Sequence, residues 1–314
     1  RVNGEILQKD MMTSENQINN MIKKLLDVRK KEIYEKQKDV DLAFISNGIR
    51  FRANIFQTSS GPSIVLRKII EEIPELASLN LPAVVSDIIR EKAGLILVTG
   101  GTGSGKSTSI AAMINEINKT RKENIITIED PIEFIHKDQE SIISQREIGK
   151  DANTFHGALR AALREDPDVI LVGELRDVET IGMALTAAET GHLVFGTLHT
   201  SSAAKTIDRI VDVFPAVEKE MVRAMLSESL CAVISQMLLK KVGGGRIAAH
   251  EIMMGTAAIR NLIREGKIAQ MYSAIQTGQG LGMQTLDQNL AELLGKGLIN
   301  KEEARFRAVH KENI

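Results

Sequence analysis

The sequence predicts an α/β protein in two parts, a small α/β unit over residues 1–80 and a larger domain with a largely parallel sheet over residues 81–314. Segments of the first part alternate apolar and polar residues, which is typical of a half-exposed antiparallel sheet. The second part contains short apolar runs separated by helical patterns, as in parallel strands covered by helices on both faces. A glycine-rich motif between one such run and a helix is the third observation.

The first part is expected to begin with a strand over residues 1–7 and to continue with a single helix over residues 14–37. Apolar residues recur within 14–37 at helical spacing, and Ser14 is the candidate N-cap. The small unit should therefore open with one strand and one helix.

An antiparallel sheet is expected next. Residues 41–58 and 61–69 alternate with period two, and Asn47-Gly48 predicts a tight turn within the first of these segments. Residues 71–82 contain two prolines and are expected to form a linker to the larger domain.

The larger domain is expected to alternate strands and helices. Residues 106–120 have a helical apolar stripe. From Pro215 onward the chain is expected to be mainly helical, apart from a hairpin around residues 240–253. The expected buried strands are residues 94–100 (GLILVTG), 124–130 (NIITIED), 168–174 (DVILVGE) and 192–200 (HLVFGTLHT).

Residues 258–267 (AIRNLIREGK) predict a helix with an apolar stripe and two arginines, Arg260 and Arg264, on the opposite side. Two arginines four residues apart repel each other weakly. By itself the pattern fits an ordinary amphipathic helix, and the alternative is a surface that couples the protein to a partner.

Composition limits the classes of function. The chain has 40 Lys and Arg residues against 41 Asp and Glu residues, no Trp and two Tyr, so we expect no direct binding of nucleic acid. The single cysteine, Cys231, excludes a disulfide within one chain and fits a reducing cytoplasm. No signal peptide or membrane-spanning segment is expected in the sequence.

The segment GGTGSGKS, residues 100–107, fits the phosphate-binding motif GxxxxGK[ST]. Glycines let backbone N–H groups wrap phosphates, and the following helix adds its positive N-terminal end. Lys106 should reach the β- and γ-phosphates, and the Ser107 hydroxyl should bind Mg²⁺. The sequence thus predicts binding of ATP or GTP by Gly101, Thr102, Gly103, Ser104, Gly105, Lys106, Ser107 and Thr108.

Acidic residues follow two of the apolar strands. The strand at residues 125–130 ends in Glu129 and Asp130, with Glu133 shortly after, and the strand at residues 168–174 ends in Glu174. Because the carboxyl ends of parallel strands meet at one edge, these carboxylates should converge on the phosphate loop. Glu174 is expected to reach Mg²⁺ directly or through water.

Two histidines flank the strand at residues 193–198. His199, or Thr197 beside it, is expected to sense the γ-phosphate, whereas His192 lies at the opposite end and is expected to be structural. No Cys, His or carboxylate stands at ligand spacing near them, so we expect no zinc.

Four segments together resemble the secretion ATPases of type II secretion and type IV pili, in which they are the Walker A, Asp-box, Walker B and His-box segments. Further segments, residues 197–215, 258–265, 269–278 and 282–287, resemble the pilus retraction ATPases within that family. The four segments are TGGTGSGKST at 99–108, TIEDPIEF at 127–134, LREDPDVILVGELRD at 163–177 and TAAETGHLVFGTLHT at 186–200.

The resemblance implies roles for single residues. Glu133 would be the catalytic glutamate that polarises water, supported by Glu129 and Asp130, and Glu174 would be the Walker B acid. Two arginines of the small unit, Arg52 and Arg67, would act as arginine fingers on the phosphates. Further polar links around the site would come from Arg164, Arg176 and Arg209.

The resemblance also implies the fold and the assembly. A RecA-like P-loop NTPase domain would follow a smaller PAS-like domain, which is expected to lack the family's first strand and helix. Nucleotide would lie between the two domains, and six copies would form a ring. ATP hydrolysis with Mg²⁺ would power type IV pilus retraction through a PilC-like inner-membrane platform protein, from the cytoplasmic face of that membrane.

Three other functions compete with this one. An extension or secretion ATPase of the same family typically carries a four-cysteine zinc module, which one cysteine cannot build. A RecA-like DNA translocase would need a basic track or stacking aromatic residues. A scaffolding ring without activity would not need Lys106, Glu133 and Glu174.

Overall fold

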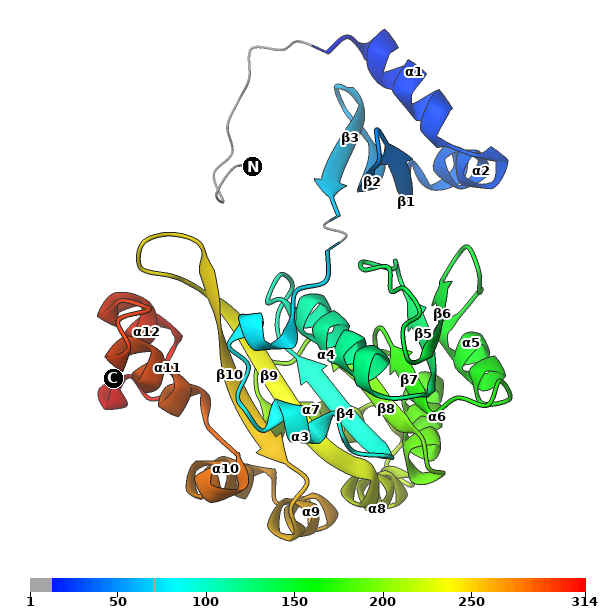
Figure 1. Ribbon diagram of the computed structural model, residues 1–314. Coiled ribbons are helices and arrows are strands. Elements are labelled where there is room, and N and C mark those ends of the chain that lie inside the picture. The colour runs from blue at the N-terminus through cyan, green and yellow to red at the C-terminus, as the bar shows by residue number, and fades with distance from the viewer. Residues whose placement is uncertain (1–12, 70–71) are drawn as a thin grey trace. The chain divides into compact units, whose positions relative to one another are not determined.

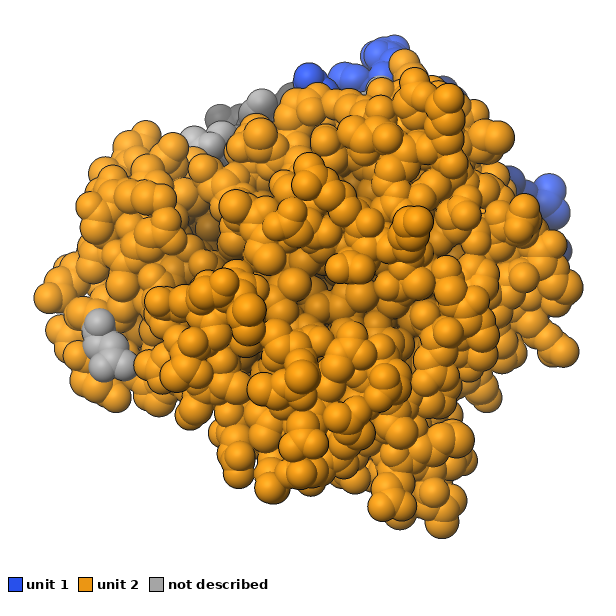
Figure 2. All heavy atoms as spheres, turned by 60° about the horizontal axis from the view of Figure 1, so that its bottom comes forward, with its two compact units in different colours: residues 1–72 blue, residues 73–314 orange. Residues whose placement is uncertain are grey.

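The computed structural model describes residues 13–69 and 72–314, and the chain divides into two compact units, Arg1–Glu72 and Ile73–Ile314. Figure 2 colours the two units separately. The division lies between Glu72 and Ile73, ahead of the expected boundary at residue 80. The strand expected over residues 1–7 lies outside the described residues.

The smaller unit contains two helices where the sequence predicted one. Helix α1 covers Glu15–Leu25 and α2 covers Val28–Gln37. Ser14 caps α1 through a capping box with Gln17, as expected. The single-helix prediction is wrong because Asp27 caps a new helix: its carboxylate accepts the Lys30 N–H at 2.8 Å.

Three antiparallel strands complete the smaller unit in the order β1-β2-β3. Asn47 and Gly48, with φ of 51° and 72°, form the tight turn between β1 and β2, so the expected turn is confirmed. One face of the sheet packs on the helices through Ile22, Leu42 and Ile55. The strands are β1 Asp39–Ser46, β2 Ile49–Thr58 and β3 Gly61–Lys68.

The larger unit is built on a seven-stranded sheet in the order β10-β9-β4-β8-β7-β5-β6. All neighbouring pairs are parallel except β9 with β10, which is antiparallel. The strands are β4 Gly94–Thr99, β5 Asn124–Glu129, β6 Ile142–Glu147, β7 Val169–Val172, β8 Leu193–Leu198, β9 Leu230–Lys240 and β10 Arg246–Met254.

Helices cover both faces of this sheet (Figure 1). Side chains of α3 and α4 pack on one face, and those of α5 to α10 pack on the other. These helices are α3 Val85–Ile88, α4 Lys106–Thr120, α5 Phe155–Ala162, α6 Val178–Glu189, α7 Ala203–Asp212, α8 Lys219–Ser229, α9 Ala257–Arg264 and α10 Met271–Thr277.

The C-terminal helices form a separate core on the β9–β10 hairpin. Leu239 and Ile247 of the hairpin pack with Leu290 of α11 (Leu286–Gly295) and Ala304 of α12 (Lys301–Arg307). The short 3₁₀ helices are η1 Leu76–Leu79, η2 Ile268–Gln270, η3 Gln279–Leu281 and η4 Lys311–Asn313.

The larger unit differs from the sequence predictions in its linker, in one additional strand and in the start of its hairpin. The predicted linker contains η1, whose Leu76 packs on the α3–α4 side of the sheet. Strand β6 was not predicted. The hairpin is confirmed, but its first strand, β9, begins at Leu230 in a region expected to be helical.

Cys231 of β9 is half-buried, and its burial raises the pKa of the thiol to about 11. Within residues 13–69 and 72–314, no helix is long and apolar enough to cross a membrane.

Candidate functional site

The phosphate-binding motif forms the turn from β4 into α4. Gly100, Gly103 and Gly105 have φ of 143°, 76° and 92°, a range that favours glycine. A Cβ on Gly100 would lie 2.2 Å from the Gln236 carbonyl oxygen, so a side chain does not fit there. Helix α4 begins at Lys106 and turns its N-terminal end toward this loop.

Lys106 is 9% exposed, and its Nζ donates to the carbonyl oxygens of Gly100 at 2.8 Å and Gly101 at 3.2 Å. Burial lowers the pKa of its ammonium group, and the carboxylates of Glu174 and Glu133 oppose that shift. The cation is therefore held on the loop, within electrostatic reach of both acids. Ser107, the next residue, is exposed.

Glu129, at the end of β5, is half-buried. Its Oε1 accepts the Thr127 hydroxyl at 2.7 Å and the Gln145 amide at 3.2 Å. Burial raises the pKa of Glu129, and the nearby Glu133 carboxylate adds to that shift. Gln145 lies on β6, and because that strand was not predicted, the sequence offered no signal for this contact.

Glu174, two residues after β7, connects the ends of β7 and β8. Its carboxylate lies 2.6 Å from Arg176 Nη2 and 3.4 Å from Nε2 of His199, which follows β8. The hydrogen bond from Arg176 to Glu174 raises the pKa of the arginine. The Thr197 hydroxyl donates to the Gly173 carbonyl, and the Gly173 N–H donates to Ile128 of β5 at 2.7 Å. The acidic edge is thus tied together across β5, β7 and β8.

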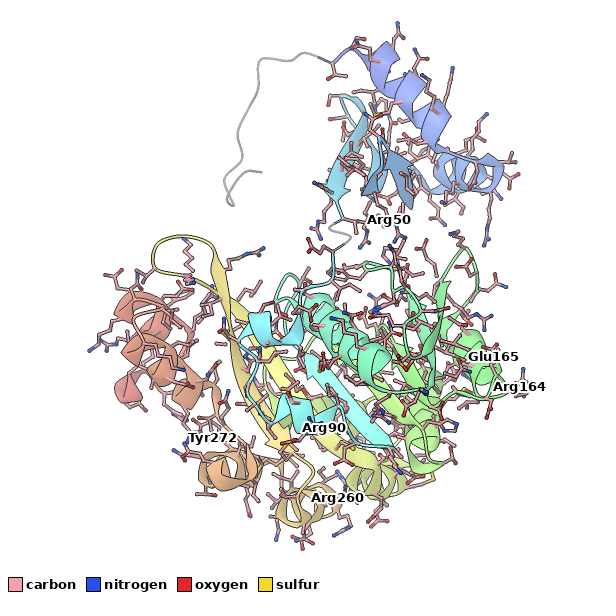
Figure 3. All side chains as sticks on the ribbon, viewed as in Figure 1. Arg50, Arg90, Arg164, Glu165, Arg260 and Tyr272 are labelled. Carbon is pink, nitrogen blue, oxygen red and sulfur yellow. The ribbon has the colours of Figure 1, made fainter. Side chains whose placement is uncertain are left out.

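The other expected residues lie as follows. Asp130 is exposed and acts electrostatically on Arg176. His192 Nδ1 donates a 2.9 Å hydrogen bond to the Ala187 carbonyl at the opposite end of β8, consistent with a structural role. Arg164 donates to the Arg160 carbonyl at the far side of α5 (Figure 3), and Arg209 is exposed on α7. Of the three arginines expected as polar links, Arg176 is the one that contacts the acidic edge among the described residues.

Gln236 of β9 also contacts the phosphate loop, and sequence reasoning missed it. Its Nε2 donates to the Ser104 carbonyl at 2.8 Å, and its Oε1 accepts the Ser109 hydroxyl at 2.8 Å. The available signal was a glutamine inside the apolar run that contains Cys231, but that run was not assigned to the sheet.

Arg52 and Arg67 face each other on the smaller unit. They are direct partners in the β2–β3 register. Because Ala53 and Ile55 point into the unit's core, the alternate residue Arg52 points to the opposite face, where Arg67 lies beside it. Asp41 lies 3.7 Å from Arg52 on the same face. The two arginines thus form a basic pair on the face of the sheet that does not pack on α1 and α2.

The paired arginines of α9 have an acidic neighbour in their own domain. Arg264 lies 2.9 Å from the Glu228 carboxylate at the end of α8. Arg260 donates to the carbonyl oxygens of Gly255 at 2.7 Å, Glu228 at 2.5 Å and Leu230 at 3.2 Å. Both arginines therefore have partners within their own domain, and the coupling surface stays a prediction. Since Leu230 begins β9, Arg260 lies at the sheet edge opposite the phosphate loop (Figure 3).

These groups fit a nucleotide with a divalent cation. The loop glycines, the α4 N-terminus and Lys106 suit phosphate oxygens. The Ser107 hydroxyl and the Glu174 carboxylate are oxygen donors of the kind that Mg²⁺ prefers. Glu129 and Glu133 lie on the same edge and could act on a water molecule.

Comparison with known proteins agrees with this geometry. Residues 1–245 match the family model of type II/IV secretion system proteins. The chain is 55% identical to the type IV pilus retraction ATPase PilT of Pseudomonas aeruginosa over 316 residues, covering 100% of this chain and 92% of that protein. It is also 55% identical to a twitching motility protein of Neisseria gonorrhoeae over 318 residues, covering 100% of this chain and 85% of the relative.

A crystal structure of the pilus retraction motor PilT with bound ADP is similar in fold. The TM-score is 0.88 at 49% sequence identity, over 96% of this chain and 86% of that chain. The likeness supports the expected RecA-like ATPase domain with a small N-terminal domain. The chain therefore belongs to the family of type II/IV secretion system proteins.

Proposed function

We propose that this protein is an ATP-hydrolysing motor that powers the retraction of type IV pili. The observation that carries the proposal is that Lys106 on the phosphate loop lies within electrostatic range of Glu133 and Glu174, which follow two other strands. A site that only bound nucleotide would need the loop and the lysine but not the two acids. The names of two relatives, a pilus retraction ATPase and a twitching motility protein, supply the process.

ATP would bind with its phosphates on residues 101–108, where Lys106 neutralises charge on the β- and γ-phosphates. Mg²⁺ would be held by Ser107 and by Glu174, directly or through water, and would stabilise negative charge on the phosphates. Glu133 would orient the attacking water and accept its proton. Asp130 and Glu129 would support Glu133, because the Glu129 carboxylate already accepts hydrogen bonds from Thr127 and Gln145.

His199 would report the state of the site. It contacts Glu174 and stands at the end of β8, just before α7. A shift of Glu174 after hydrolysis would therefore reach α7 through the short segment at residues 199–202. Arg176, on the other oxygen of Glu174, limits the positions that this carboxylate can take.

The proposal extends to the assembly. Six copies would form a ring in which nucleotide lies between a smaller and a larger unit, with Arg52 and Arg67 supplying positive charge to the phosphates. The ring would act at the cytoplasmic face of the inner membrane on a PilC-like platform protein. The pairing of Arg52 with Arg67 in the β2–β3 register supports this role, because it puts both cations on the same face of the small sheet.

Two variants test the proposed function. Lys106→Ala should lose nucleotide binding, because it removes the cation at the phosphates. Glu133→Gln should still bind nucleotide while turnover falls by about 10² or more, because the amide keeps the shape but cannot accept a proton. Nucleotide affinity, steady-state hydrolysis with and without DNA, and pilus retraction in cells would be measured for the parent and both variants.

We expect hydrolysis by the parent to be unaffected by DNA, and both variants to fail in retraction. Turnover that rises with DNA would favour a translocase. Near-parental turnover of Glu133→Gln would move the role in water activation to Glu129 or Asp130. Parental pili that extend but never retract would favour an extension ATPase.

A further inference from the structure

Gln236 is a buried amide with two hydrogen bonds to the phosphate-loop region. It is 4% exposed and lies within β9, between Ser235 and Met237. The Ser104 carbonyl can only accept, so the amide nitrogen must face it, and the amide oxygen then faces the Ser109 hydroxyl. Both partners are buried as well, Ser104 at 6% and Ser109 at 3% exposure. The side chain thus has one orientation that satisfies both contacts.

The backbone and side chain of Gln236 also contact the two ends of the glycine-rich turn. A Cβ on Gly100 would collide with the Gln236 carbonyl oxygen, and a Cβ on Gly105 would lie 2.8 Å from the Gln236 amide nitrogen. Ser104 lies on the loop between these two glycines, and Ser109 lies beyond them in the first turn of α4. Strand β9 therefore supports the loop at its start, at its end and at the helix that follows.

Removal of this amide would free the loop. The Ser104 carbonyl and the Ser109 hydroxyl would remain buried without a side-chain partner, and a buried polar group without a partner is unfavourable. The loop could recover those hydrogen bonds only by leaving its present conformation. Nucleotide would then have to reorder the loop on binding, which weakens affinity.

We propose that Gln236 is a positioning residue that keeps the phosphate loop in the conformation that receives nucleotide, without touching the nucleotide itself. The inference rests on the proposed nucleotide site. It assigns two functions to different strands of the sheet: the acids after β5 and β7 act on the reaction, whereas β9 supports binding. Loss of Gln236 should therefore raise KM and Kd, and leave the turnover of the filled site largely intact.

The test uses three variants of the full chain. Gln236→Met keeps the length of the side chain but removes both hydrogen bonds, Gln236→Glu places a carboxylate against the Ser104 carbonyl, and Ser109→Ala removes one bond from the far side. Affinity for a fluorescent ADP analogue and the steady-state KM and kcat for ATP would be measured, with folding checked by circular dichroism.

We expect Gln236→Met and Gln236→Glu to raise Kd and KM by about 10-fold, the change that follows from one buried carbonyl losing its partner. Ser109→Ala should raise both by a smaller factor, and kcat should stay within about 2-fold of the parent for all three. The matched control is Gln284→Met, which removes a comparable amide-to-carbonyl bond, to His250 at 3.0 Å, outside the phosphate loop. It should leave Kd and KM unchanged.

Other outcomes overturn the inference. Parental Kd in the folded Gln236 variants would show that the loop keeps its conformation without the amide. A fall in kcat at unchanged KM would place Gln236 in the reaction itself. If both Gln236 variants fail to fold, parental Kd in Ser109→Ala overturns the proposal. Lys106→Ala distinguishes a failure of this inference from a failure of the proposed nucleotide site. If Lys106→Ala also binds nucleotide with the parental Kd, the proposed nucleotide site is wrong.

Discussion

Glu129 and Glu133 stand four residues apart at the same strand end but in different surroundings. The carboxylate of Glu129 is held by Thr127 and Gln145, and its burial raises its pKa. Glu133 acts electrostatically on both Glu129 and Lys106. The hydrogen bonds that hold Glu129 favour Glu133 as the base and Glu129 as a support.

The pH dependence of stability tests the environment of Glu129. Because its pKa in the folded protein is raised above the ordinary value of 4.5, the folded state holds this proton more tightly than the unfolded chain. That contribution to stability is fully present below the ordinary pKa and is lost as the pH rises through the raised pKa. Glu129→Gln cannot ionise, so the difference in Tm, variant minus parent, should grow as the pH rises through this window.

The measurement is thermal unfolding by circular dichroism from about pH 4 to about pH 8, which spans the ordinary range of carboxyl titration and beyond. Glu140→Gln, which neutralises an exposed carboxylate, is the matched control. A Tm difference for Glu129→Gln that stays constant across this range would mean that burial does not shift the pKa of Glu129.

Helix α9 shows how one element joins others. Its residues Ile259 and Ile263 are fully buried in the core on the α5–α10 side of the sheet. Its Arg260 binds carbonyl oxygens at the end of α8 and at the start of β9, where helix carbonyls lack partners within the helix. Arg264, one turn later, makes an exposed ion pair with Glu228. The two arginines therefore stabilise the fold to different degrees.

Single substitutions should separate the two arginines. Arg260→Ala should lower the free energy of unfolding of the larger unit by about 2 kcal/mol, because three charged hydrogen bonds to backbone carbonyls, two of them partly buried, are lost. Arg264→Ala should lower it by at most about 0.5 kcal/mol, because exposed ion pairs contribute little. Thermal unfolding of both variants beside the parent measures the difference, and equal Tm values would contradict the assigned contacts.

Arg264→Ala is also the variant that tests α9 as a coupling surface. It leaves the three carbonyl contacts of Arg260 in place. If α9 couples the motor to a partner, the variant should hydrolyse ATP like the parent but retract pili poorly in cells. Full pilus retraction in cells that carry Arg264→Ala would mean that α9 has only a structural role.

The whole molecule combines two units with different parts of the proposed chemistry. The larger unit carries the phosphate loop and the acids, and the smaller unit carries the basic pair Arg52 and Arg67. In the proposed motor, hydrolysis depends on both units, so the smaller unit should affect turnover although it holds none of the sheet-edge residues.

Arg52→Ala and Arg67→Ala test this dependence. Each should lower turnover by about 10², with a smaller effect on nucleotide affinity, because the positive charge is needed most when charge develops in the transition state. Lys23→Ala, which removes an exposed cation from α1 of the same unit, is the control. If both arginine variants hydrolyse ATP like the parent in intact assemblies, the arginine-finger role is wrong.

Local patterns in the sequence were enough to predict much of this protein. The loop of residues 100–107 is recognisable because its glycines, lysine and serine are adjacent in the chain. The acids at Glu129 and Glu174 could be expected to converge because parallel strands end at a common edge. The small antiparallel sheet followed from its period of two and from the Asn47-Gly48 turn.

Tertiary structure decided the rest, because contacts between distant segments leave little trace in local patterns. Strand β6 is paired only through β5 and has no unbroken apolar run, so its Gln145 could not be placed beside Glu129. The break at Asp27 depends on one side chain competing for the backbone. Ser104 and Gln236 are 132 residues apart in the chain and come into contact only when β9 pairs with β4. The hydrogen bond from Arg260 to Leu230 likewise depends on the position of β9 in the sheet.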